Sequence, residues 1–158
     1  MSNVKAIPEG FHSVTPYLIV DNAAEAIEFY KKALGATEKF RLPGPDGTVG
    51  HAEIQIGNCM LMLGDECPQM QARSAKTIGG SPIGLCVYLE DVDTAFAQAV
   101  KAGGKEVRPV QDQFYGDRSG TFEDPYGLQW TLATHIEDVS AEEIQRRMQA
   151  YFEQKQTA

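Results

Sequence analysis

The chain has 158 residues and a formal net charge of −8, with 42% hydrophobic and 23% charged residues. This length suits one domain or two small fused modules, and the composition is ordinary for a soluble globular protein. The acidic balance disfavours a nucleic-acid binder, which needs a basic face for phosphates, and it disfavours docking on anionic membranes. The N-terminus shows no secretory signal, and the cysteines lack CxxC spacing, so we expect reduced thiols in a cytoplasmic protein.

Residues 13–65 predict a first βαβββ module. Asn22 is a suitable N-cap for a helix, and Gly35 is a natural C-cap. The Gly57-Asn58 pair predicts a tight hairpin turn, because glycine and asparagine tolerate left-handed backbone conformations. We expect strands at Val14–Val20, Thr37–Leu42, His51–Ile56 and Cys59–Leu63, and a helix at Ala23–Leu34.

A polar connector, residues 66–81, precedes a second module of the same order at residues 82–135. It lacks clear periodicity and predicts a linker or a mobile loop. Asp91 caps the second helix, and the turn Asp124-Pro125-Tyr126-Gly127 closes the last hairpin. We expect strands at Ile83–Leu89, Lys105–Val110, Arg118–Glu123 and Leu128–Thr134, and a helix at Val92–Ala102.

The two modules are related by one offset of 69 residues, which holds for caps, helix positions and turn glycines. Asn22 and Asp91 obey it, as do Gly47 and Gly116, and this joint pattern indicates an internal duplication. A last helix is expected within residues 139–154, where Ser140 and Glu143 form a capping box. Its apolar stripe either packs on the body or binds a partner. It consists of Ile144, Met148, Tyr151 and Phe152.

Alternation along the strands predicts two different faces for each sheet. The helix of each module covers the apolar face, and we call the other one the open face. In the first module Glu53 is expected opposite Met62 on the open face, while Leu18 and Leu63 lie under the helix. In the second module Trp130 is expected beneath the helix, and the residues Gly84, Cys86, Tyr88, Arg118, Gly120, Phe122, Gln129 and Thr131 are expected on the open face.

An open face with aromatic, sulfur-containing and polar residues suits a cleft whose apolar walls hold a small ligand while a few polar groups orient it. Arg118 either holds an anionic ligand group or forms a structural ion pair with Asp117, Glu123 or Glu53. Cys86 is either a nucleophile, if a base lies nearby, or a small buried packing residue. The candidate ligand-binding residues are Tyr17, His51, Glu53, Met62, Cys86, Tyr88, Arg118, Phe122, Gln129 and Thr131.

The run GDRSGTFEDPYGLQW, in a duplicated βαβββ chain, resembles the vicinal oxygen chelate superfamily of glyoxalase I, bleomycin-resistance proteins and extradiol dioxygenases. Its PhnB-like branch is the most similar one. The resemblance implies an α+β fold of cupped mixed sheets, a cleft between the modules, and a homodimer. It covers about residues 13–139.

Members that bind a metal carry His, Gln or Glu at positions that correspond here to Thr15, Met62, Gly84 and Thr131. None of these four is a normal ligand for a hard metal ion, so we expect no metal cofactor at them. The resulting hypothesis is a protein that binds a small organic molecule without the usual metal. The alternatives are a metal-dependent lyase or dioxygenase with displaced ligands, drawn from His51, Glu53 and His12, and a scaffold without a ligand.

Overall fold

The computed structural model describes residues 4–156, so the outermost parts of the polar N-terminal segment and of the C-terminal tail lie outside the described residues. Two four-stranded mixed sheets have the strand orders β1-β4-β3-β2 and β5-β8-β7-β6. In each sheet the first strand pairs in parallel with the last, and the other pairs are antiparallel.

The first module contains β1 (Tyr17–Val20), α1 (Ala23–Leu34), β2 (Thr37–Pro43), the short helix η1 (Pro45–Gly47), β3 (Val49–Ile56) and β4 (Cys59–Asp65). The second contains β5 (Gly84–Tyr88), α3 (Val92–Lys101), β6 (Lys105–Asp112), β7 (Asp117–Glu123) and β8 (Gln129–His135).

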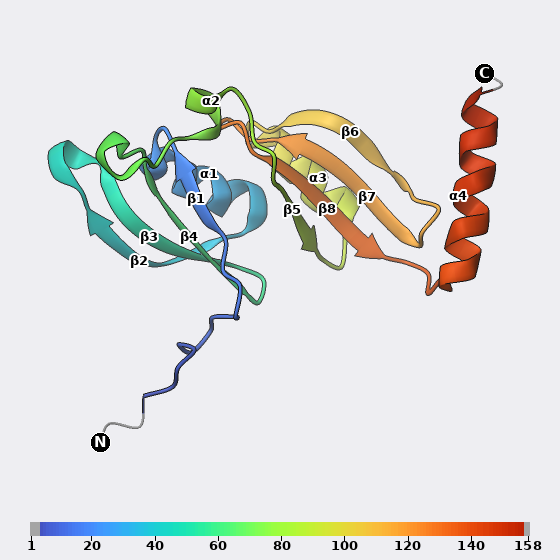
Figure 1. Ribbon diagram of the computed structural model, residues 1–158, viewed down its shortest axis with the longest axis horizontal. Coiled ribbons are helices and arrows are strands. Elements are labelled where there is room, and N and C mark those ends of the chain that lie inside the picture. Colours follow the sequence, from blue (N-terminus) through green and yellow to red (C-terminus); the bar gives the residue numbers. More distant parts are fainter. Residues whose placement is uncertain (1–3, 157–158) are drawn as a thin grey trace.

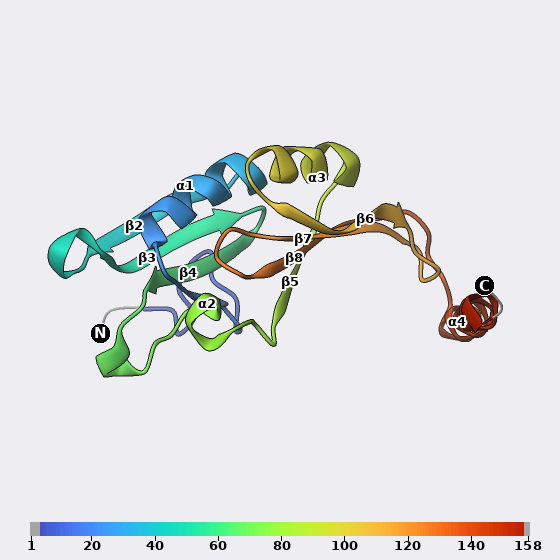
Figure 2. The same ribbon diagram turned by 90° about the horizontal axis from the view of Figure 1, so that it is seen from above.

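The two modules lie side by side, with α1 and α3 next to each other over the same side of both sheets (Figure 1, Figure 2). The connector between β4 and β5 lies on the opposite side and contains η2 (Pro68–Met70) and α2 (Ala75–Ile78). The last helix, α4 (Ala141–Gln156), stands beyond the far end of the second sheet. The predicted duplicated α+β architecture with a C-terminal helix is therefore confirmed.

The predicted caps form in the structure. The Asn22 side chain accepts a hydrogen bond from the Glu25 amide at 3.2 Å, and Asp91 accepts one from the Thr94 amide at 3.0 Å. Gly35 ends α1 with a φ of 63°, a conformation that favours glycine. The first strand, however, begins at Tyr17 and not at Val14, which is 82% exposed.

An aromatic cluster joins the two modules. Phe29 and Tyr30 of α1 pack on residues of the second module, with ring centroids 6.5 Å apart for Phe29 and Phe122 and 5.2 Å apart for Tyr30 and Trp130. Trp130 is buried as expected, but its ring packs against the helix of the first module. The two repeats therefore share one core across their boundary.

Asp124, the first residue of the predicted turn, lies at the centre of this cluster. One carboxylate oxygen accepts hydrogen bonds from the Tyr30 hydroxyl and from the Trp130 indole, each at 2.8 Å. The other accepts from the Tyr126 and Leu128 amides, each at 2.9 Å. Burial, together with this carboxylate, raises the pKa of Tyr30 well above its ordinary value. The turn motif thus also locks the modules together.

The predicted faces of the second hairpin are partly wrong. The Asp124 amide donates to the Leu128 carbonyl at 2.9 Å, so the loop has three residues where four were predicted. Phe122 then pairs with Trp130, and Thr121 pairs with Thr131. A shift of one residue moves every side chain of a strand to the other face.

Arg118, Gly120 and Phe122 accordingly lie on the helix side and not on the open face. Phe122 is fully buried between the helices, and Arg118 forms ion pairs at 2.8 Å with Asp93 of α3 and with Asp112, which are not the predicted partners. Ser119 and Thr121 take the open-face positions instead. In the first hairpin, by contrast, the two-residue Gly57-Asn58 turn and the pairing of Glu53 with Met62 are confirmed.

Candidate functional site

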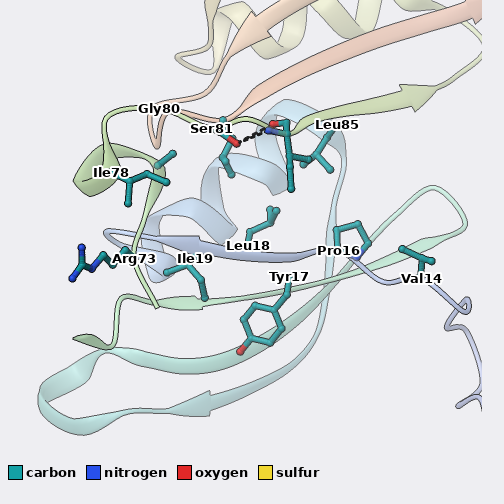
Figure 3. A pocket seen from close by; sticks show the side chains of 13 residues that line it. Val14, Pro16, Tyr17, Leu18, Ile19, Arg73, Ile78, Gly80, Ser81 and Leu85 are labelled. Carbon is teal, nitrogen blue, oxygen red and sulfur yellow. Dashed lines mark hydrogen bonds between the residues drawn. The ribbon is translucent and has the colours of Figure 1, made fainter. Parts of the chain in front are cut away.

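A cavity of about 380 Å³ lies at the junction of the modules, between β1 and β5 and beside the connector (Figure 3). Leu18 and Pro16 border it from the first module, and Leu85 borders it from the second. Ile78 borders it from α2, so the connector forms one of its walls. Most of the lining is apolar, and all three parts of the chain contribute to it.

The polar groups at this cavity are already engaged or point elsewhere. The Ser81 hydroxyl donates to the Ile83 carbonyl at 2.9 Å and accepts from the Ile83 amide at 3.2 Å. The hydroxyl of Tyr17, which also lines the cavity, is bonded to His51. Figure 3 shows the Arg73 guanidinium directed away from the space. The cavity therefore offers mainly van der Waals contact.

A second cavity of about 280 Å³ continues the same junction beyond Pro16 and Leu85, which line both. Cys86 and Tyr88, two predicted ligand-binding residues, lie at its wall. Cys86 is exposed, so its interpretation as a buried packing residue is wrong. Partial burial and the Asp117 carboxylate raise the pKa of the Cys86 thiol, which disfavours the reactive thiolate.

Three predicted residues, Tyr17, His51 and Glu53, form a connected polar group on the open face of the first sheet. The Tyr17 hydroxyl lies 2.9 Å from Nδ1 of His51, and Nε2 of His51 lies 3.5 Å from Glu53. Phe40 and Leu42 of β2 pair with Glu53 and His51, and about half of each side chain is exposed. Met62 lies opposite both Tyr17 and Glu53.

The positions that hold a metal in some relatives are not all neighbours here. Across the parallel strand pairs, Met62 lies opposite Tyr17, and Thr131 lies opposite Cys86. Thr15 precedes β1, and Gly84, at the start of β5, lies opposite Gln129. Within residues 4–156 no group of three or more His, Cys, Asp or Glu side chains is arranged to hold a metal ion.

Near the start of α4, Asp117 joins two side chains. It accepts a hydrogen bond from the Tyr88 hydroxyl at 2.7 Å and pairs with Nδ1 of His135 at 2.8 Å. Nε2 of His135 lies 3.0 Å from Asp138. The bond to Asp117 raises the pKa of Tyr88 to about 12, and the two carboxylates raise the pKa of His135 above 6.5.

This arrangement predicts a pH-dependent contribution of His135 to stability. Because folding raises its pKa, the native state holds the proton more tightly than the unfolded chain does. The stabilisation is complete below about pH 6.5 and is lost as the pH rises through the native pKa. Denaturant unfolding should show His135→Gln less stable than the wild type at pH 5.5, with a smaller difference at pH 8.5. The exposed His12→Gln is the control, and a His135→Gln difference independent of pH would contradict the prediction.

Several residues of these sites were not predicted from the sequence. Ile78 and Ser81 lie in the connector, whose short α2 turn is too brief to give a helical period. The Ser74 side chain, which caps α2 by accepting from the Thr77 amide at 3.2 Å, was the available signal. Among the residues that the structure describes, no helix is long and apolar enough to span a membrane.

Paired βαβββ modules with helices on one side and cavities at their junction define the class of the glyoxalase fold. The chain matches the model of the Glyoxalase/Bleomycin resistance protein/Dioxygenase superfamily over residues 10–132, and it belongs to that superfamily. It is 40% identical over 139 residues to an uncharacterised protein of Mycobacterium bovis, a match that covers 86% of this chain and 91% of the relative.

Solved structures agree on the fold. Protein PA1353 from Pseudomonas aeruginosa has a TM-score of 0.64 and 23% identity, covering 80% of this chain and 99% of that one. A PhnB protein from Bacillus cereus has a TM-score of 0.60 and 21% identity, and the match covers 78% of this chain and 99% of that one.

Proposed function

We propose that this protein binds a small, predominantly apolar organic molecule in the 380 Å³ cavity between β1 and β5. The observation that carries the proposal is the composition of the wall: side chains from both modules and from the connector meet there. Ligand sites in proteins commonly have volumes of about 300–1,000 Å³ and mostly apolar linings. Membership of the superfamily, which includes bleomycin-resistance proteins, supports a binding role at the module junction.

The chemistry of the wall favours an apolar ligand over a strongly polar one. Ser81 and Tyr17 already have hydrogen-bond partners, so a polar ligand would lose water contacts without gaining equivalent ones. Leu18, Ile78 and Leu85 would instead bury the apolar surface of a ligand, at about 25 cal/mol per Å². Tyr17 also places the Tyr17–His51–Glu53 group beside the cavity, where it can contact a polar substituent at one end of the ligand.

The test is a thermal-shift and fluorescence screen with uncharged aromatic and aliphatic compounds, followed by titration of the hits. A ligand at one hundred times its Kd should stabilise the native state by about 2.7 kcal/mol. Ile78→Trp, which fills the cavity from α2, should weaken binding at least tenfold. Met70→Trp is the matched control, because Met70 is an 80% exposed connector residue outside the lining.

The proposal is wrong if the hits bind Ile78→Trp as tightly as the wild type, since the ligand would then lie elsewhere. It is also wrong if no uncharged compound stabilises the protein. Binding that disappears after Tyr17→Phe but survives Ile78→Trp would place the ligand on the open face of the first sheet and not in the cavity.

A further inference from the structure

A third space, of about 210 Å³, lies on the open face of the second sheet. Its lining differs from that of the junction cavities, because hydroxyl, amide and guanidinium groups predominate and no described carboxylate is among its lining residues. Arg108 of β6, Ser119 and Thr121 of β7 and Thr131 of β8 border it, and Tyr151 of α4 borders it from the side. It is separate from the cavity of the proposed function.

Two of these polar groups have no side-chain partner among the residues that the structure describes. Ser119 is only 5% exposed, and its hydroxyl forms no hydrogen bond within residues 4–156. Arg108 forms no ion pair with any acidic side chain that the structure describes. The Thr121 and Thr131 hydroxyls, by contrast, lie 2.9 Å apart and satisfy each other. Among the described residues no fully buried side-chain polar atom lacks a partner, so the Ser119 hydroxyl keeps access to this space and is available to donate to a ligand.

The backbone directs Arg108 to this place. Arg108 pairs with Thr121, and the β6–β7 register shifts on both sides of it, between Glu106 and Arg108 and between Arg108 and Gln111. Such irregularities re-aim side chains and occur beside functional sites. In the first module the register of the corresponding strand shifts between Glu38 and Phe40, and Phe40 is the residue that then pairs with Glu53.

We propose that this space binds a small anion, a carboxylate or phosphate compound, held by the Arg108 guanidinium and the Ser119 hydroxyl. A guanidinium binds planar oxyanions with two parallel hydrogen bonds, and a hydroxyl supplies a further donor. A volume of 210 Å³ equals the volume that about seven water molecules occupy in the liquid, which suits a small organic acid. The net charge of −8 opposes the binding of an anion only weakly, because salt screens charges that lie more than about 8 Å apart.

Helix α4 forms part of the wall. Tyr151 packs on Phe114 with ring centroids 5.8 Å apart, and Arg147 pairs with Glu137 at 2.8 Å, which holds the helix against the β6–β7 loop at the end of the second sheet. The last helix therefore has a role at this site in addition to its contacts with the end of the second sheet.

The test is to titrate the full chain with sodium phosphate and, separately, with malonate. Binding is monitored by the amide chemical shifts, and sodium chloride keeps the ionic strength constant. The amides of Arg108, Ser119 and Thr121 should shift together. Arg108→Gln should weaken binding at least tenfold, while Arg108→Lys and Ser119→Ala should each weaken it severalfold. Lys105→Gln, which removes the same charge from the same strand outside the lining, should stay within twofold of the wild type.

The proposal is overturned if neither anion shifts these amides, or if chloride shifts them equally. It is also overturned if Arg108→Gln and Lys105→Gln weaken binding by the same factor, since only net charge would then matter. Saturable shifts with glycerol but not with phosphate or malonate would replace the anion with a neutral polyol. Loss of anion binding in Arg108→Gln should leave the binding of uncharged compounds at the module junction intact.

Discussion

Asp124→Ala should lower the free energy of unfolding by roughly 3 kcal/mol or more. Its carboxylate accepts four hydrogen bonds at 2.8–2.9 Å from Tyr30, Trp130 and two turn amides. Alanine would leave these donors without partners in a site that excludes water, and each unsatisfied buried donor costs about 1–3 kcal/mol. The loss affects both modules, because Tyr30 belongs to the first and Trp130 to the second.

Chemical denaturation of Asp124→Ala, Asp124→Asn and Glu123→Ala measures this effect. Asparagine keeps one acceptor oxygen for the turn amides but turns an NH₂ group toward Trp130, so an intermediate loss is expected. Glu123→Ala removes a neighbouring carboxylate that is only partly buried and should change stability by less than about 0.5 kcal/mol. If Asp124→Ala were no less stable than Glu123→Ala, the interpretation of Asp124 as the inter-module lock would be wrong.

Gly116→Ala should have the second large effect, a loss of at least about 2 kcal/mol in stability. Gly116 has a φ of 98°, which side chains strongly disfavour, and an added Cβ would overlap the carbonyl oxygen of Glu137. The Gly116 carbonyl also accepts hydrogen bonds from the Ile136 and Glu137 amides at 2.9 and 3.0 Å. This contact holds the segment that leads into α4, so the substitution must displace that segment.

The duplication supplies a matched control. Gly47 occupies the corresponding place 69 residues upstream and has a φ of 80°, but an added Cβ there meets nothing within 4 Å. Gly47→Ala should therefore cost only the backbone strain, about 1–2 kcal/mol. Gly116→Ala should additionally weaken phosphate binding at the Arg108 site, because α4 carries Tyr151. Equal losses in the two variants would show that the contact with Glu137 is unimportant.

Local sequence signals predicted most of the secondary structure. Asn22, Asp91 and Gly35 mark helix ends because their side chains or backbone freedom act over only a few residues. The Gly57-Asn58 turn fixed the register of the first hairpin for the same reason, and with it the positions of His51, Glu53 and Met62 on one face.

The sequence by itself thus determined the repeated βαβββ order and the open face of the first sheet, because caps, turn residues and strand alternation are local signals, while the resemblance of its GDRSGTFEDPYGLQW run pointed to the superfamily. Only the tertiary structure decided the register of the second hairpin. There, Asp124 is held by Tyr30, 94 residues away, and the one-residue difference in the loop exchanges Phe122 for Thr121 on the open face. The module junction likewise depends on the packing of distant segments, so neither its cavity nor the place of Arg108 could be deduced from local pattern.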